Sequence, residues 1–199
     1  MGRIIAVVGT TGVGKTAMVR ALCKHGLFAV GLEQHKERPF QEEFKTNSAF
    51  ALPNQIDYLL LRAEQEQILR QSTQTGLVDG GLDLDYHGFT QLYYSRGWLS
   101  GREYNLCERF YEFVRTFMPP PDLVIHLTAR PEVIHQRLVA RRRINITDPR
   151  DIQKLASYLD GWLSTIPPEG VIRLDVSETD PGYRYLLPSL LPQLHKYLM

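Results

Sequence analysis

This sequence has little of several features that mark particular classes of protein. Its 199 residues include only two cysteines, Cys23 and Cys107, without the spacing of a metal site, so we expect free thiols in a reducing compartment. No apolar run approaches the roughly 20 residues of a membrane-spanning helix. The formal net charge of +1 gives no reason to expect a nucleic acid or a membrane surface as a partner. Repeats, low-complexity stretches and a linker are also missing, so we expect one domain over residues 1–199. From the few cysteines and the short apolar runs, we expect this domain in the cytoplasm.

What the chain does have is an ordinary globular composition, with 43% hydrophobic and 23% charged residues. Short apolar runs alternate with longer helical stretches, a pattern typical of a parallel sheet covered by helices on both faces. The predicted strands are 4–8, 28–32, 77–78, 123–127 and 171–174. The predicted helices are 16–24, 54–74, 86–96, 100–117, 131–142, 148–163 and 183–197. We therefore predict an α/β fold with a five-stranded parallel sheet.

The most specific motif lies near the start of the chain. An apolar run at 4–8 leads into G-x-x-x-x-G-K-T, and a stretch without Gly or Pro follows. In this context the backbone N–H groups of the loop and the N-terminus of the next helix form a concave phosphate site. Lys15 can reach the β- and γ-phosphates of a nucleoside triphosphate, and Thr16 carries the type of hydroxyl that binds Mg²⁺. The predicted nucleotide-binding residues are Gly9, Thr10, Thr11, Gly12, Val13, Gly14, Lys15 and Thr16.

Two acidic residues stand at the ends of predicted strands, Glu33 after the second strand and Asp79 after the third. In an open α/β sheet the ligand crevice lies beyond the carboxyl ends of the strands, so both carboxylates are expected near the phosphate loop. Asp79 follows Leu77 and Val78, which makes it a candidate for a Walker B carboxylate on the metal side. Acidic residues at strand ends also serve as helix caps, and the position alone does not separate these two interpretations.

Arginines crowd the predicted helix 131–142 and the residues around it, namely Arg130, Arg137, Arg141, Arg142 and Arg143. Arg137 and Arg141 are four residues apart and share one face of a helix. Such a helix can act as a lid that brings guanidinium groups onto a transferring phosphate, and cations of this kind raise phosphoryl-transfer rates by about 10³–10⁵. The alternative interpretation is a solvated basic face without a specific role.

Taken together, these spacings make the chain resemble the deoxynucleoside kinase family over nearly its whole length. The resemblance implies a P-loop NTPase fold with an Arg-rich lid formed by Arg137, Arg141 and Arg143. It also implies that Glu33 is the base for the 5′-hydroxyl of a nucleoside. ATP would be the donor, with Mg²⁺ held by Thr16 and Asp79.

The same resemblance implies how the nucleoside is held. Family members carry a Gln that reads the nucleobase and an Arg seven residues later, which match Gln55 and Arg62. An Asp six residues past the acid of the third strand matches Asp85, which is expected to pair with Arg62 near the base. The resemblance further implies a homodimer formed through the helices 54–74 and 100–117. The base and the sugar stay open at this point, because the amide of Gln55 can face either way.

Four residues, at three places in the chain, depart from the family pattern. In place of the family's Arg-Ser pair after the acid of the third strand, this chain has Gly80-Gly81. Arg38 replaces the Asn that precedes a proline and an aromatic residue in the family, and Ile146 replaces an acidic residue of the lid. Loss of one charge-assisted hydrogen bond is worth roughly 1.5–3 kcal/mol, or about ten- to a hundredfold in rate. We therefore expect weakened turnover or an altered substrate, unless Arg38 or Arg142 replaces the missing charge.

The leading hypothesis is an enzyme, an ATP-dependent kinase for the 5′-hydroxyl of a (deoxy)nucleoside. The alternative is a degenerate homologue that binds nucleotide and acts as a regulatory or heteromeric subunit, which Gly80-Gly81 would support. A switch GTPase is disfavoured because the chain has no N-K-x-D motif for guanine. Kinases of other small alcohols or of nucleoside monophosphates also carry this loop, although the latter would need more arginines around the acceptor phosphate.

Overall fold

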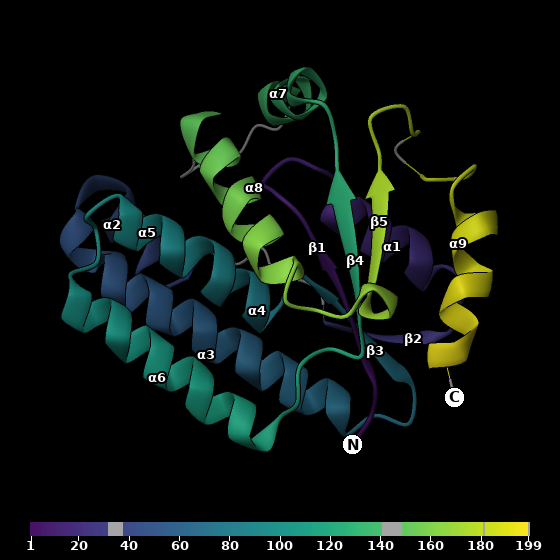
Figure 1. Ribbon diagram of the computed structural model, residues 1–199, viewed down its shortest axis with the longest axis horizontal. Coiled ribbons are helices and arrows are strands. Elements are labelled where there is room, and N and C mark those ends of the chain that lie inside the picture. The colour runs from purple at the N-terminus through teal and green to yellow at the C-terminus, as the bar shows by residue number, and fades with distance from the viewer. Residues whose placement is uncertain (32–37, 141–148, 181, 199) are drawn as a thin grey trace.

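Five parallel strands form one sheet in the part of the chain that the structure describes (Figure 1). The structure is a computed structural model, and it describes residues 1–31, 38–140, 149–180 and 182–198. The strands are β1 (Ile4–Val8), β2 (Phe28–Gly31), β3 (Thr75–Asp79), β4 (Leu123–Thr128) and β5 (Val171–Asp175). Their order in the sheet is β2-β3-β1-β4-β5, with β1 at the centre. The predicted α/β fold with a five-stranded parallel sheet is confirmed.

The residues of β1 alternate between two cores on opposite faces of the sheet, as the period of two in a strand requires. Ile5 packs into a core that α1 (Lys15–Cys23) and α9 (Leu187–Leu194) cover. Ala6 packs into the other core, to which α8 (Pro149–Leu163) contributes. Every residue of β1 is buried, which is why this strand is a continuous apolar run in the sequence.

A third apolar cluster lies beside the sheet among α2 (Gln41–Thr46), α3 (Ala51–Arg70), α5 (Gln91–Ser95) and α6 (Gly101–Phe117). Figure 1 shows α3 and α6 as two long helices that run next to each other. A capping box, in which the side chains of Ser100 and Glu103 accept hydrogen bonds from each other's backbone N–H, begins α6. The other helical elements are η1 (Ser48–Phe50), α4 (Leu82–Leu84), η2 (Asp85–Thr90), α7 (Pro131–Ala140), η3 (Pro168–Gly170) and η4 (His195–Tyr197).

A buried ionic network joins α3, α4 and α6. The Glu66 carboxylate accepts hydrogen bonds from Arg70 at 2.9 Å and from Arg115 at 3.0 Å. Arg115 also donates to Asp83 at 2.6 Å, and the Tyr111 hydroxyl donates to the same carboxylate at 2.7 Å. Buried charges are tolerated when they are paired in this way. The network therefore holds the short helix α4, and with it the start of η2, against α3.

Several predicted boundaries were wrong. The helix predicted at 54–74 runs from Ala51 to Arg70, and the strand predicted at 77–78 extends over 75–79, because Gly76 also pairs with β1 and β2. The helix predicted at 86–96 is two segments, the π-helical η2 and α5. The helix predicted at 183–197 begins at Leu187, since Tyr183 has a left-handed φ of 54°. Within the described ranges, none of the helices has both the length and the apolar character to cross a membrane.

Candidate active site

The loop between β1 and α1 has the backbone conformation that the glycine motif predicts. Gly9 has a φ of 146°, and a Cβ atom there would lie 2.5 Å from the carbonyl oxygen of Leu127. Gly14 has a φ of 119°, and a Cβ atom there would lie 2.2 Å from the hydroxyl oxygen of Tyr183. Both positions therefore require glycine for conformation and for space. The loop ends at Lys15, where α1 begins, so its N–H groups lie at a helix N-terminus.

Lys15 folds back over this loop. Its ammonium group donates to the carbonyl oxygens of Gly9 and Thr10, at 3.0 Å each. The cation is thus held at the loop itself, where a phosphate group that enters the concavity would meet it. This placement agrees with the phosphate-binding role that the motif predicts for Lys15.

Thr16 and Asp79 lie together at the carboxyl edge of the sheet. The Thr16 hydroxyl donates to Oδ2 of Asp79 at 2.5 Å. Asp79 is only 1% exposed, and its Oδ1 is buried with no hydrogen-bond partner among the described residues. A buried carboxylate oxygen without a partner is costly, and a cation would satisfy it. A hydroxyl and one carboxylate are the oxygen donors that a nucleotide-bound Mg²⁺ takes from a protein, so the residues fit this ion.

Arg137 lies against the same loop. Its guanidinium donates to the carbonyl oxygens of Val13 at 2.6 Å and Val176 at 2.8 Å. It therefore ties α7 to both the phosphate loop and the segment after β5. Arg130 pairs instead with the exposed Glu178. The other two predicted lid arginines, Arg141 and Arg143, lie outside the described residues, as do Arg142 and the predicted base Glu33.

The pairing of Arg62 with Asp85 that the resemblance implied is present. The Arg62 Nε donates to Oδ2 of Asp85 at 2.7 Å, and both side chains are at least nine-tenths buried. Nη1 of Arg62 also donates to Gln65 at 3.2 Å. Asp85 follows β3 by six residues, so the pair stands near the same edge of the sheet as Asp79.

Gln55 is buried next to this pair. Its Nε2 donates to the main-chain carbonyl oxygen of Asp85 at 3.0 Å and to the Thr90 hydroxyl oxygen at 2.8 Å. Asn54, the preceding residue, is 1% exposed, and both polar atoms of its amide lack a hydrogen-bond partner among the described residues. Thr90 and Asn54 were not predicted from the sequence. No motif marks either residue, and Thr90 reaches Gln55 only through the π-helical turn of η2.

The Gly80-Gly81 pair forms the turn between β3 and α4. Their φ angles are 85° and 88°, so a side chain at either position would be strained. A Cβ atom on Gly80 would lie 3.7 Å from Nη2 of Arg62. Among the described residues, Arg62 thus has its guanidinium group beside this turn. Arg38 has a different partner: it makes a two-pronged ion pair with Asp57 at 2.6 Å for each bond, which raises the pKa of its guanidinium.

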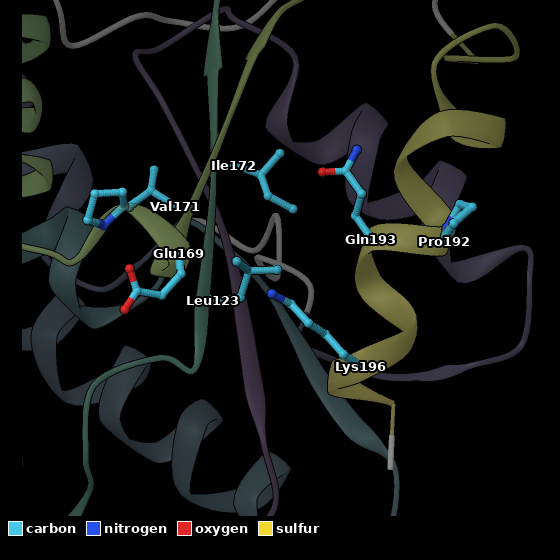
Figure 2. Close-up of a pocket in the computed structure, with 8 residues that line it drawn as sticks. Leu123, Glu169, Val171, Ile172, Pro192, Gln193 and Lys196 are labelled. Carbon is cyan, nitrogen blue, oxygen red and sulfur yellow. The ribbon is translucent and has the colours of Figure 1, made fainter.

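A separate pocket lies at the opposite end of the sheet (Figure 2). It has a volume of about 380 Å³. Leu123 and Val171, the first residues of β4 and β5, line it together with Glu169, Gln193 and Lys196. Ligands of open parallel sheets bind beyond the carboxyl ends of the strands, and this pocket is at the amino ends. It is therefore not part of the site around the phosphate loop.

Comparisons with known proteins agree with this arrangement. A family model of deoxynucleoside kinases matches residues 5–182. Deoxyadenosine/deoxycytidine kinase from Bacillus subtilis (strain 168) is 24% identical over 182 residues, which are 89% of this chain and 84% of the relative. Deoxyadenosine kinase from Dictyostelium discoideum is 29% identical over 143 residues, which are 71% of this chain and 58% of that one.

Solved structures have the same fold. Deoxyadenosine kinase from M. mycoides with bound dATP matches with a TM-score of 0.79 and 20% identity, over 96% of this chain and 98% of that one. The same enzyme with its products dCMP and a flexible dCDP bound also gives a TM-score of 0.79 and 20% identity, over 95% of this chain and 99% of that one. Their fold is that of the P-loop NTPases, which the loop and the parallel sheet described above share. Because the family model covers most of its length, the chain belongs to the deoxynucleoside kinase family and is a nucleoside-phosphorylating kinase.

Proposed function

We propose that this kinase transfers the γ-phosphoryl group of ATP to the 5′-hydroxyl of a deoxynucleoside. The observation that supports this most is that two sets of residues lie at one edge of the sheet. Lys15, Thr16 and Asp79 form the phosphate side, and the buried Arg62–Asp85 pair follows Asp79 by six residues. A donor nucleotide on the first set and a nucleoside against the second would lie next to each other, which is the arrangement that phosphoryl transfer needs.

On the donor side, the loop N–H groups would bind the phosphates, and the Lys15 ammonium would exchange its two carbonyl partners for phosphate oxygens. Thr16 and Asp79 would hold Mg²⁺, which when bound supplies positive charge against the phosphate oxygens. Arg137 is already fixed against the loop carbonyl of Val13, so its cation would face the developing charge without a large rearrangement. We propose that Arg141 and Arg143 add to this charge from the lid.

On the acceptor side, we propose that Glu33 takes the proton of the 5′-hydroxyl and that Gln55 and the Arg62–Asp85 pair hold the base. The Gly80-Gly81 turn lacks the arginine that the family places there, and Arg38 is bound to Asp57. We therefore expect turnover about ten- to a hundredfold below that of a family member with the arginine. The alternative of a non-catalytic regulatory subunit finds no support in the named relatives, which are kinases.

The test is conversion of deoxynucleosides to monophosphates by the purified protein with ATP and Mg²⁺. Lys15→Met and Glu33→Gln should each abolish the product. Lys196→Met and Glu169→Gln are matched controls, because both residues line the pocket at the other end of the sheet. ATP binding without monophosphate from any common deoxynucleoside would overturn the proposal and favour the degenerate homologue.

We further propose that the protein is a homodimer formed through α3 and α6. Five large apolar side chains on these two adjacent helices are 45% to 67% exposed, namely Leu60, Ile68, Leu106, Phe113 and Phe117. Several exposed large apolar side chains on adjacent helices are typical of an interface with another chain. Size-exclusion chromatography with light scattering should give a dimer for the native protein and a monomer for Phe113→Glu, while Val139→Glu on α7, equally exposed, should stay dimeric. A monomeric native protein would refute the dimer.

A further inference from the structure

The fold sets the orientation of the Gln55 side-chain amide. Its polar end faces the main-chain carbonyl oxygen of Asp85 at 3.0 Å. A carbonyl oxygen has no proton to donate, so the group that faces it must be the NH₂ and not the oxygen of the amide. The chemistry of the partner, rather than the similar shape of the two ends, therefore decides which way Gln55 points.

Thr90 completes this arrangement. Its hydroxyl donates to the same Asp85 carbonyl at 3.1 Å, and this leaves the hydroxyl oxygen to accept from Nε2 of Gln55 at 2.8 Å. Thr90 lies five residues after Asp85, and the π-helical turn of η2, which pairs residues five apart, brings the two together. Thr90 has no exposed surface, and the Asp85 side chain is held by Arg62. The two acceptors are thus fixed in place.

Both N–H groups of the Gln55 amide donate hydrogen bonds, one to the Asp85 carbonyl oxygen and one to the Thr90 hydroxyl. Its Oε1 accepts no hydrogen bond within the described ranges. The group that Gln55 can offer to a ligand is therefore an acceptor. Next to it in the chain, the buried amide of Asn54 has no partner among the described residues, although buried amides are normally paired. The N-terminal part of α3 thus lacks hydrogen-bond partners that a polar ligand would supply.

We infer that Thr90 is a specificity-determining residue, which acts by holding Gln55 as a hydrogen-bond acceptor. This inference rests on the proposed function. A base that presents an exocyclic amino group to Gln55, as adenine and cytosine do, would donate to its Oε1. A base with a carbonyl oxygen at that position, as in uracil, thymine or hypoxanthine, would place oxygen against oxygen and leave both without a proton. The site therefore selects nucleosides of amino-bearing bases.

The first experiment compares nucleosides that differ in this group, deoxycytidine with deoxyuridine and deoxyadenosine with deoxyinosine. With saturating ATP and Mg²⁺, kcat/KM of the native protein should favour the amino member of each pair by about a hundredfold or more, since a site built around one hydrogen bond rejects the analogue that lacks it. Equal use of both members, or preference for the carbonyl member, would overturn the inference while leaving the proposed function intact.

The second experiment tests Thr90 itself. Thr90→Val keeps the shape but removes the hydroxyl, so the Gln55 amide can rotate, and the deoxycytidine/deoxyuridine ratio should fall about tenfold. Thr90→Ser keeps the hydroxyl and should keep the ratio. A structural defect alone would lower kcat/KM for both nucleosides and leave their ratio unchanged, so an unchanged ratio in Thr90→Val refutes the role.

Nucleoside binding measured by isothermal titration without ATP gives a readout that does not require phosphoryl transfer. The ratio of the Kd values for deoxyuridine and deoxycytidine should follow the same pattern in the native protein, Thr90→Val and Thr90→Ser. A protein that binds the two nucleosides with this preference but forms no monophosphate refutes the proposed function and supports the inference. Equal Kd values refute the inference.

Discussion

Replacement of Asn54 by leucine should make the folded protein more stable. The Asn54 side chain is 1% exposed, and neither its nitrogen nor its oxygen has a hydrogen-bond partner among the described residues. Each buried polar group without a partner costs about 1–3 kcal/mol relative to water. Leucine is of similar size and has no such groups, but its different shape requires some repacking that offsets part of the gain. We therefore expect the free energy of unfolding to rise by about 1–3 kcal/mol.

Thermal and urea unfolding followed by circular dichroism measure this change. For a domain of this size, each kcal/mol corresponds to roughly 2–4 °C in Tm. The matched control is Asn47→Leu. Asn47 is exposed, and its Oδ1 accepts from the backbone N–H of Ala49 at 2.9 Å, so its loss should lower stability by about 0.5–2 kcal/mol.

The same variant should be stabilised less by a ligand. If a bound nucleoside satisfies the Asn54 amide, saturating deoxycytidine or deoxyadenosine will raise the Tm of the native protein more than that of Asn54→Leu, because ligand stabilisation follows affinity. A drop in stability of more than about 1 kcal/mol in Asn54→Leu without ligand would show that the amide is already paired in the fold, and would refute the reasoning.

Three further outcomes are expected. Arg62→Leu removes the ion pair of the buried Asp85 carboxylate and should lower the free energy of unfolding by about 3–5 kcal/mol. The double variant Arg62→Leu/Asp85→Leu should recover much of this loss. An Arg62→Leu variant as stable as the native protein would contradict this expectation. Burial lowers the pKa of His87 below its ordinary value of 6.5, so near that pH the unfolded chain binds a proton that the folded chain does not. The free energy of unfolding should therefore fall as the pH drops through 6.5. His87→Phe can keep the ring stacking on Trp162, and in this variant the free energy of unfolding in urea should change less between pH 7 and pH 5. Burial raises the pKa of the Cys107 thiol to about 11, so a thiol reagent at pH 8 should react with it only as fast as the protein unfolds. Fast labelling of the native protein would refute the burial of this thiol.

The phosphate site could be predicted from the sequence because it is local. Its N–H groups come from consecutive residues, and Gly9 and Gly14 are required by the conformation of that single turn. The buried strands were also predictable, since a parallel strand covered on both faces must be an apolar run. The Arg62–Asp85 pair was predicted through the resemblance to the family, and the structure contains it because a buried arginine and a buried carboxylate each need a partner.

Other features of the site depend on contacts between segments that are far apart in the sequence. Nothing local in the chain predicts that Arg38 pairs with Asp57 rather than standing in for the arginine missing at Gly80. The helix predicted over 86–96 contains the π-helical turn η2, which packs closely on α8: a Cβ atom on Gly88 would lie 2.7 Å from Cδ1 of Leu155. A helical pattern in the sequence does not distinguish this turn from an ordinary one.

The orientation of Gln55 shows most clearly what the sequence predicts and what only the folded chain decides. The resemblance to the family implies that Gln55 reads the base, but the two ends of its amide are alike in shape and opposite in hydrogen bonding. Only the folded chain brings the carbonyl of Asp85 and the hydroxyl of Thr90 to one of those ends. Sequence patterns specify which groups a segment carries, and tertiary packing decides which of their atoms are already bound and which are left to meet a ligand.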